Sequence, residues 1–431
     1  MNAENDKRVD RLEEENLRLK EAVAELSILN DISTAISSTS SLDMIIDLIV
    51  HKCIKHLKVE QGTIALLDEK QEDAPFHTII RKVDTSKEII PFRLNAQLTG
   101  WMIKNQRALL INDLRNDERF SENNVDDYPV NSLICVPLLA KGKMIGSLNV
   151  YNKRDKEGFS ENDKRLLTII AAQSAQTIEN ARLYEEEQAL LHMREEMRIA
   201  QRIQMELLPS ESPLIDGYDV AGISIPAKTV GGDYFDFICL DDKRMAFCLG
   251  DISGKGMPAA LLMSNLQATL RGQSLESLTA CECVTMANSQ MFKSTEDDKF
   301  ATLFFAILDH KNHEIKYCNA GHNYPYLVST NDHTRLEAGG LVLGAIEEYD
   351  FIEESVPIGQ DDILLVFSDG ASEAQDADGE FFTEQKLLEL VMDHREESAE
   401  RILDGIVTAV RAHSTNVTQT DDITLLVIKR L

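Results

Sequence analysis

The chain has 431 residues, more than one hydrophobic core usually supports, so its length predicts two or three domains. Hydrophobic residues make up 43% of it and charged residues 27%. No run approaches the roughly 20 uncharged apolar residues that span a bilayer, which excludes an integral membrane protein. The net charge of −29 disfavours nucleic acid as a partner, because a phosphate backbone needs a basic surface. The N-terminal residues are polar and lack the apolar segment of a signal peptide, so we expect a cytoplasmic protein with no membrane partner.

Residues 1–30 carry a heptad repeat. β-Branched residues or Asn occupy its a positions and Leu its d positions, a pattern typical of a parallel two-stranded coiled coil. The repeat consists of Val9, Leu12, Asn16, Leu19, Val23, Leu26 and Asn30. We therefore predict a coiled-coil dimerisation helix over 1–30, with a solvated single helix as the alternative.

Residues 31–182 predict a compact α+β domain. An amphipathic helix follows Ser41, its N-cap, and strand-like apolar runs come next, ending in a hairpin around residues 141–143. A long helix then starts at Ser160, with Asp163 at the spacing of a capping box. This order of elements, with the segments LICVPLLAKGKMIGSLNVYNK and FSENDKRLL, resembles a GAF sensor domain.

The GAF resemblance leaves the signal open. Most of the signature of cyclic-nucleotide-binding members is present, as Asn152, Lys153, Phe159 and Asp163. Lys164, however, stands where that signature ends in an acidic residue. The same residues also have a structural role in GAF domains that bind no nucleotide. The candidate signals are therefore an unidentified small molecule, a protein or a cyclic nucleotide.

Helical character continues over residues 183–208, with no Pro or Gly before Pro209. An apolar stripe with spacings of three and four runs through Leu183, Leu190, Met193, Met197, Ala200, Gln204 and Leu207. A charged linker would not keep such a stripe. We predict a second coiled-coil helix that links the sensor to the domain behind it, and hence a homodimer held through its helices.

Residues 209–431 contain four acidic motifs at strand ends or in turns. They are VGGDYFD with Asp233, GDISGKG with Asp251, FSDGASEA with Asp369, and TDDIT with Asp421 and Asp422. A single such Asp is usually a turn former or a helix cap. Four of them, each beside Gly or another Asp, are harder to explain as turns. Converging carboxylates would repel one another unless cations held them together.

The residue types in these motifs favour particular ions. Oxygen ligands without His or Cys select hard cations, Mg²⁺ or Mn²⁺, and the glycines let backbone carbonyls join the coordination shell. Two such ions bridged by one Asp generate hydroxide at neutral pH and neutralise a phosphate group in the transition state. The sequence has no cysteine-nucleophile signature, Ser-His-Asp set or P-loop that would compete. The motifs therefore predict attack of metal-activated water on phosphorus.

The motifs of residues 209–431 closely resemble those of the PPM metal-dependent protein phosphatases, in particular the bacterial SpoIIE/RsbU-type branch. They occur in that family's order as PAKTVGGDYFDF, GDISGKGMPAALLMS, CNAGHNYPYLV, LGAI, FSDGASEA and DDITLLV. The resemblance implies a β-sandwich flanked by helices, so that the whole chain is an α+β multidomain protein. It also implies a protein-serine/threonine phosphatase that uses two Mn²⁺ or Mg²⁺ ions.

The resemblance assigns the catalytic and metal-binding roles residue by residue. Its metal ligands are Asp251 bridging the two ions, the carbonyl of Ile252, Asp233 on the second ion, and Asp369 and Asp421 on the first. Asp236 and Asp422 are neighbouring carboxylates that stand either behind the ligands or in their place. Asp421 is favoured over Asp422 because it aligns with the family's D-[DN]-x-T pattern.

The chain also departs from its eukaryotic relatives. They have a His just after the bridging Asp that protonates the leaving group, whereas residues 253–256 here read SGKG. Their phosphate-binding Arg has no clear match either. His322 in AGHNYP is the candidate acid, although a structural histidine in a turn is the favoured interpretation.

In relatives of this architecture the substrate is an anti-sigma-factor antagonist phosphorylated on Ser or Thr, within a sigma-factor partner-switching pathway. The resemblance therefore implies a sensor-regulated phosphatase acting on such a phosphoprotein. A signal at the GAF domain would change the helices at 183–208, and these would shift the helix that follows Asp251. The alternative is a non-catalytic, GAF-coupled dimeric scaffold with a degenerate phosphatase fold, which the loss of a metal Asp would mark.

Overall fold

The computed structural model describes most of the chain, namely residues 41–67, 76–82, 96–117, 119–120, 130–155, 157–273, 279–295, 299–330 and 332–431, with isolated positions between 11 and 30. It divides into two compact units, Met1–His192 and Met193–Leu431. Apart from those isolated positions, the predicted coiled coil at 1–30 lies outside the described residues and stays a prediction. None of the helices in the described part of the chain combines the length and the apolarity needed to cross a bilayer.

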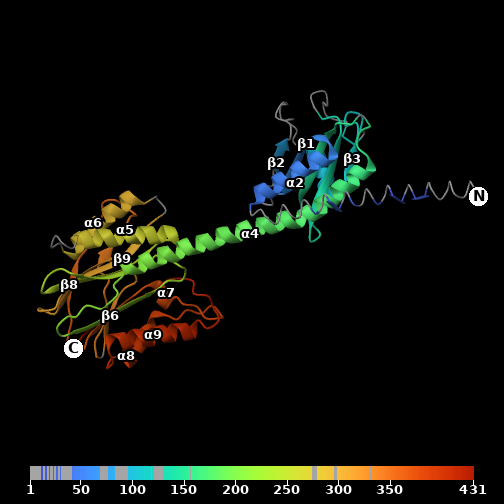
Figure 1. Cartoon of the computed structure of the whole chain (residues 1–431). Coiled ribbons are helices and arrows are strands. Elements are labelled where there is room, and N and C mark those ends of the chain that lie inside the picture. The colour runs from blue at the N-terminus through green and yellow to red at the C-terminus, as the bar shows by residue number, and fades with distance from the viewer. Residues whose placement is uncertain are drawn as a thin grey trace, which may run out of the picture. The chain divides into compact units, whose positions relative to one another are not determined.

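The first unit is built on an antiparallel five-stranded sheet in the order β2-β1-β5-β4-β3. Its strands are β1 Val59–Leu67, β2 Phe76–Lys82, β3 Leu109–Ile111, β4 Leu133–Ala140 and β5 Lys143–Lys153. Helix α2 (Leu42–Leu57) and the first part of helix α4 (Glu161–Leu207) bury one face of the sheet. Helix α3 (Ala96–Asn105) packs on the other face (Figure 1). The predicted α+β domain is confirmed.

Three local signals shape this unit as the sequence predicts. Ser41 caps α2 by accepting a hydrogen bond from a backbone N–H three residues on. Lys141 and Gly142, with φ of 51° and 81°, form the tight turn between β4 and β5, where the strand twist favours positive φ at both positions. At the start of α4 the Ser160 N–H donates to the Asp163 carboxylate at 2.8 Å, and the Asp163 N–H donates to the Ser160 hydroxyl at 3.2 Å.

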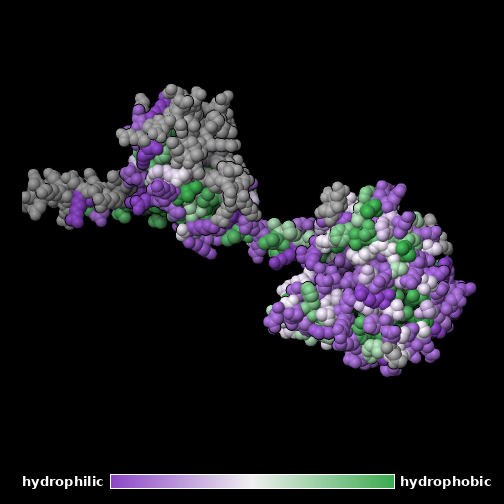
Figure 2. All heavy atoms as spheres, turned by 180° about the vertical axis from the view of Figure 1, so that it is seen from behind, coloured by the Kyte–Doolittle hydropathy of each residue, from purple (hydrophilic) through white to green (hydrophobic). Residues whose placement is uncertain are grey.

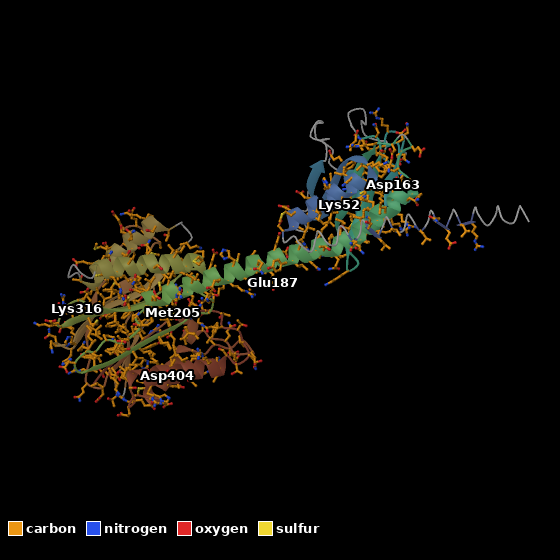
Figure 3. The ribbon with its side chains drawn as sticks, viewed as in Figure 1. Lys52, Asp163, Glu187, Met205, Lys316 and Asp404 are labelled. Carbon is orange, nitrogen blue, oxygen red and sulfur yellow. The ribbon has the colours of Figure 1, made fainter. Side chains whose placement is uncertain are left out.

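The residues of the cyclic-nucleotide signature contact one another or their neighbours. The Lys153 ammonium lies 2.8 Å from the Asp163 carboxylate and 5.8 Å from the centre of the Phe159 ring. Figure 3 labels Asp163 at the start of α4. The Asn152 amide donates to Glu60 at 2.8 Å. These contacts join β5 to β1 and to the beginning of α4, so they support the structural interpretation of the signature.

Helix α4 is continuous over 47 residues. In its middle, hydrophobic side chains lie exposed among charged ones (Figure 2); they include Leu183, Tyr184, Leu190, Leu191 and Met193. Figure 3 labels Glu187 in this stretch and Met205 near the end of the helix. Gln204, which the sequence assigned to the helix-pairing face, is instead buried within the second unit. The pairing of two copies of α4 stays a prediction.

The second unit contains two mostly antiparallel sheets that pack face to face. One has the order β13-β10-β9-β8-β7 with β14 beside β10, and the other has the order β12-β11-β15-β16-β6. The strands of the first are β7 Tyr234–Cys239, β8 Arg244–Ile252, β9 Ala301–Asp309, β10 Glu314–Ala320, β13 Gly339–Gly340 and β14 Glu354–Pro357. Those of the second are β6 Tyr218–Ile225, β11 Tyr326–Val328, β12 His333–Arg335, β15 Ile363–Phe367 and β16 Ile423–Arg430.

Helices cover the outer faces of this sandwich (Figure 1). Helices α5 (Met257–Gln273) and α6 (Ala280–Ser294) lie on the first sheet, and α8 (Glu384–Asp393) and α9 (Ala399–His413) lie on the second. Strand β15 reads ILLVF because both of its faces are covered. Leu364 and Val366 pack into the sandwich, while Leu365 packs with α8 and α9. The predicted β-sandwich flanked by helices is present.

Candidate metal centre

Two of the candidate aspartates meet at one end of the first sheet. Asp233 immediately precedes β7, and Asp251 is the penultimate residue of β8. The antiparallel register places Tyr234 opposite Gly250, so the next pair along the ladder brings Asp233 opposite Asp251.

The other two lie at the end of the second sheet. Asp369 follows β15 and starts the short helix α7 (Asp369–Ser372), and Asp421 lies two residues before β16. These strands are antiparallel partners, and the Ser368 N–H extends the ladder by donating to the Thr424 carbonyl at 2.9 Å. Asp369 and Asp421 therefore flank the same strand ends.

Asp233, Asp251 and Asp369 each have a pKa that burial and a neighbouring carboxylate of the four raise. Burial, and next the charges of Asp369 and Asp421, raise the pKa of Asp251 to about 7. Burial and the charge of Asp251 raise the pKa of Asp233 well above its ordinary value. The pKa of Asp369 is raised by its burial and by Asp421. Four residues far apart in the sequence are thus brought together at one edge of the sandwich.

Glycines allow the backbone to close in around these carboxylates. A Cβ on Gly370 would stand 2.1 Å from the Asp422 carbonyl oxygen, so only glycine lets the start of α7 pack against the segment before β16. A Cβ on Gly232 would lie 3.0 Å from the Ile252 carbonyl oxygen. That carbonyl, which the family resemblance implies as a metal ligand, therefore borders the Asp233 loop.

Asp422 serves the backbone of the loop that carries Asp233. Its Oδ1 accepts the Ala227 N–H at 2.7 Å. Its Oδ2 accepts the Gly232 N–H at 2.6 Å and the Asp233 N–H at 3.3 Å. The Asp422 side chain is buried, and its two oxygens hold residues 227–233 in place.

The donors suit a hard cation. Asp233 Oδ2 is buried and has no hydrogen-bond partner among the described residues, which is costly for a carboxylate oxygen unless a cation lies beside it. Every candidate ligand is an oxygen atom, the preference of Mg²⁺ and Mn²⁺. As they stand, no three acidic, histidine or cysteine side chains of the described residues converge tightly enough to hold an ion. Mutual repulsion of like charges keeps such carboxylates apart without a cation.

Lys255 is a member of the site that sequence reasoning did not single out. Its ammonium lies 2.8 Å from Asp421 Oδ2 and 2.6 Å from the Thr420 carbonyl oxygen. The charge of Lys255 also lowers the pKa of Asp369, against the larger effects of burial and Asp421. The signal for it was its place between two glycines in the motif that follows Asp251, Gly254-Lys255-Gly256.

Gln204 is a second residue that sequence reasoning missed. Its amide nitrogen donates to the Gly231 carbonyl at 2.7 Å, and its amide oxygen accepts the Gly231 N–H at 3.0 Å. Gly231 lies two residues before Asp233, so the end of α4 is bonded directly to the loop that carries this carboxylate. A polar residue within the apolar stripe was the only signal in the sequence.

His322 lies behind the carboxylates and does not reach them. Its Nδ1 is 2.8 Å from the Thr302 hydroxyl, which also accepts the Asp251 N–H at 3.3 Å. Burial lowers the pKa of His322 to about 4, with the Phe367 carbonyl partly opposing, so the ring is neutral at pH 7. This arrangement agrees with the structural histidine that the sequence favoured.

Asp236 is also separated from the carboxylate cluster. It is fully buried and accepts two hydrogen bonds from the Arg271 guanidinium, at 2.7 and 3.0 Å, and one from the Tyr234 hydroxyl at 2.6 Å. The side chain joins β7 to α5. These hydrogen bonds disfavour Asp236 as an alternative ligand.

Comparison with known protein families gives two matches. The model of the family described as Stage II sporulation protein E (SpoIIE) matches residues 241–431. The model described as GAF domain matches residues 39–179. The two matches fall on the second and first compact units of the chain.

Individual proteins also resemble this chain. Phosphoserine phosphatase RsbU of Bacillus subtilis is 30% identical over 253 residues, which cover 57% of this chain and 75% of RsbU. Protein IcfG of Synechocystis sp. is 27% identical over 263 residues, covering 54% of this chain and 41% of IcfG. Among solved structures, the SiaA-PP2C domain of Pseudomonas aeruginosa matches with a TM-score of 0.50 at 18% identity, covering 56% of this chain and 98% of that domain. That likeness shows a PP2C-like fold.

Proposed function

Because the chain belongs to the SpoIIE/RsbU family of PP2C-type protein serine/threonine phosphatases, carrying a GAF domain in front, we propose that the carboxylate cluster is its metal-dependent active site. The observation that carries this proposal is the meeting of four aspartates from both sheets, one with a buried oxygen that has no hydrogen-bond partner among the described residues. Two Mn²⁺ or Mg²⁺ ions are the proposed occupants. No metal aspartate of the family pattern is missing, which disfavours a degenerate scaffold.

The positions of the side chains support the proposed ligand roles. Asp251 stands between the two pairs of strand ends, in reach of Asp233 on one side and of Asp369 on the other, and this suits it to bridge two ions. The Ile252 carbonyl beside the Asp233 loop completes the second position. Asp369 and Asp421 serve the first.

Asp421 is proposed as the ligand in preference to Asp422. Both oxygens of Asp422 are engaged by backbone N–H groups of residues 227–233. Asp421 is half-buried, and among the described residues its Oδ2 pairs only with the ammonium of Lys255. An ion can displace that ammonium at the cost of one partly exposed ion pair, worth roughly 0–1 kcal/mol.

The bound ions would supply an activated water and neutralise phosphate charge. The chain's own residues then have three tasks. Asp422 and Gln204 fix the loop that aims Asp233, and Thr302 holds the backbone of Asp251. Lys255, once released from Asp421, would be free to contact the oxygens of a phosphorylated side chain. His322 stays neutral and buried, so the leaving hydroxyl takes its proton from water.

Regulation is proposed to run through the end of α4. The Gln204 amide bonds Gly231 beside the metal cluster, and the Gln267 side chain of α5 donates to the Leu207 carbonyl at 3.4 Å. A change in α4 therefore reaches both the Asp233 loop and the helix after Asp251. The proposed domains are a coiled coil at 1–30, a GAF-like sensor at 31–182, a signalling helix at 183–208 and the phosphatase at 209–431.

The finer biology is part of the same proposal. Relatives include a protein named phosphoserine phosphatase RsbU, which supports a phosphoprotein substrate for this chain as well. We propose an anti-sigma-factor antagonist in a sigma-factor partner-switching pathway, a small-molecule or protein signal at the sensor, a homodimer through the helices, and action in the cytoplasm.

A turnover assay tests the assignment. We expect p-nitrophenyl phosphate and phosphoserine peptides to be hydrolysed with Mn²⁺ and not with chelator, and Asp251→Ala to remove the activity while the protein stays folded. Equal turnover in chelator, or in the Asp251→Ala variant, would refute the metal site. A preference for nucleotides over phosphopeptides would refute the substrate class.

A further inference from the structure

A pocket of about 110 Å³ opens beside the carboxylate cluster. Its walls are Gly370 of α7 and the residues just after that helix, the end of α9, and the segment 414–420 between α9 and β16. Asp421 and Gly370, the neighbours of the first proposed metal position, both line it. A protein chain whose phosphorylated residue lies at the metals therefore passes this pocket with an adjacent residue.

The pocket has an apolar base and a polar rim. Val410 and Ile423 are buried and belong to the core between α9 and the second sheet. Arg411, Thr418 and Thr420 are exposed around the opening. Such a lining accepts the methylene stem of a side chain and offers hydrogen bonds and one positive charge to its polar end.

Arg411 is the charged group that sets the chemistry. Within the described part of the chain its guanidinium makes no hydrogen bond or ion pair, although the protein carries 73 acidic residues against 44 basic ones. Asp421, the acidic residue of the lining, is already paired with Lys255 at 2.8 Å. An arginine without a partner, beside a site that acts on proteins, is suited to a carboxylate supplied by the substrate.

The pocket is formed before any substrate arrives. The Gln419 amide nitrogen donates to the Ile225 carbonyl at 2.9 Å and to the Asp421 carbonyl at 2.7 Å. Ser414 ends α9 with its N–H bonded to the Val410 carbonyl at 3.0 Å, and its own carbonyl accepts the Val417 N–H. The segment therefore need not be ordered on binding, which lowers the entropic cost of recognition.

We propose that this pocket is a substrate subsite that binds an acidic side chain close to the phosphorylated Ser or Thr of the phosphoprotein, with Arg411 as its ion-pair partner. The inference rests on the proposed function, because the pocket is a substrate subsite only if Asp421, which lines it, binds a catalytic metal. The phosphoryl group itself goes to the ions, since the wall formed by Asp421 favours anions only where cations offset its charge.

The test compares phosphoserine peptides in the full chain with Mn²⁺. One peptide series carries a single Glu at each of the three positions on either side of the phosphoserine, a second series carries Gln there, and a third carries Lys. We expect the wild type to favour Glu over Gln about fivefold in kcat/KM at one position, as an ion pair at a protein surface allows. Arg411→Gln is expected to lose this preference, and Arg411→Glu to shift it toward Lys.

Arg401→Gln is the matched control, because Arg401 is an exposed arginine near the other end of α9 that does not line the pocket. It is expected to keep the wild-type preference. No Glu preference in the wild type, or the same preference in Arg411→Gln, would overturn the subsite while p-nitrophenyl phosphate hydrolysis with Mn²⁺ persists. Loss of that Mn²⁺-dependent hydrolysis in the wild type would instead overturn the proposed function, and the subsite with it.

Discussion

Each of the two units gathers charged or polar side chains at the edge of a sheet, but the two clusters differ in how they are satisfied. In the first unit Lys153 faces Asp163 and Asn152 faces Glu60, so each polar group has a complementary neighbour. In the second unit five aspartates from four chain segments lie together, and of the lysines and arginines among the described residues only Lys255 forms an ion pair with one of them.

This difference distinguishes a polar cluster that stabilises the fold from one that is suited to bind an ion. A paired cluster contributes to folding through its own hydrogen bonds, and its removal is felt mainly as lost stability. A cluster of like charges opposes folding, and here burial and repulsion raise the pKa of Asp233, Asp251 and Asp369. Such a cluster is retained only if something outside the chain, here the proposed ions, completes it.

The strongest test of this contrast is Asp233→Asn. The residue is buried, one of its oxygens has no partner in the described structure, and the charge of Asp251 opposes its ionisation. We expect turnover with Mn²⁺ to fall by more than the ~100-fold that marks loss of an outer-sphere partner of a metal. In chelator, the free energy of unfolding should stay the same or rise, because one buried like charge is gone.

Activity and urea unfolding with and without Mn²⁺ measure both parts. Full turnover in Asp233→Asn would show that the carboxylate is no ligand. A large loss of stability in chelator would show that the cluster is structural, as the one in the first unit is.

His322 tests whether the space behind the aspartates is as apolar as the structure indicates. Its folded-state pKa of about 4 lies below the ordinary value of 6.5, so the unfolded chain takes up a proton first as the pH falls. Its contribution is fully present above pH 6.5 and is lost toward pH 4, for a total of about 3 kcal/mol. In His322→Gln this part of the pH dependence should vanish. The measurement is the difference between wild-type and variant unfolding free energies from pH 7.5 to pH 4, and a flat difference would contradict the buried neutral ring.

A substitution at Gln204 tests whether hydrogen bonds from α4 hold the acidic cluster in position to bind metal. Gln204→Met keeps the length of the side chain but removes both hydrogen bonds to Gly231. We expect the Mn²⁺ concentration for half-maximal rate to rise about 10- to 100-fold, as for other groups that orient metal ligands, with a smaller change in kcat at saturating metal. Gln188→Met, at an exposed position of the same helix, is the control. An unchanged Mn²⁺ requirement in Gln204→Met would show that the hydrogen bonds from α4 do not influence the metal site.

The sequence predicted many of the helices and strands because they leave local marks, and it singled out the aspartates for the same reason. The cap at Ser41, the turn at 141–142 and the uninterrupted apolar run of β15 each reflect an interaction within a few residues or between neighbouring strands. The acidic motifs stand out because an Asp after an apolar strand is unusual.

What the sequence left open depends on contacts between distant segments. The proposed choice of Asp421 over Asp422 rests on the backbone of residues 227–233, almost two hundred positions away, whose N–H groups bond the Asp422 carboxylate. Gln204 looked like one more position on a helix stripe, and only the return of the chain at Gly231 reveals its partner. No periodicity or motif encodes such a meeting.

Lys153→Met is expected to have the smallest effect, and it tests whether the polar cluster of the first unit is structural. Although burial raises it, hydrogen bonds from Lys153 and Ser160 hold the pKa of Asp163 below its usual value. Removing the ammonium leaves a mostly buried carboxylate without its ion-pair partner, which costs about 1–3 kcal/mol of unfolding free energy. Lys104→Met, at an exposed position of α3, controls for the loss of a charge. Unchanged stability in Lys153→Met, together with an altered response to a signal, would show that the cluster around Lys153 is itself a ligand site. The contrast between a paired cluster in the first unit and an unpaired one in the second would then be wrong.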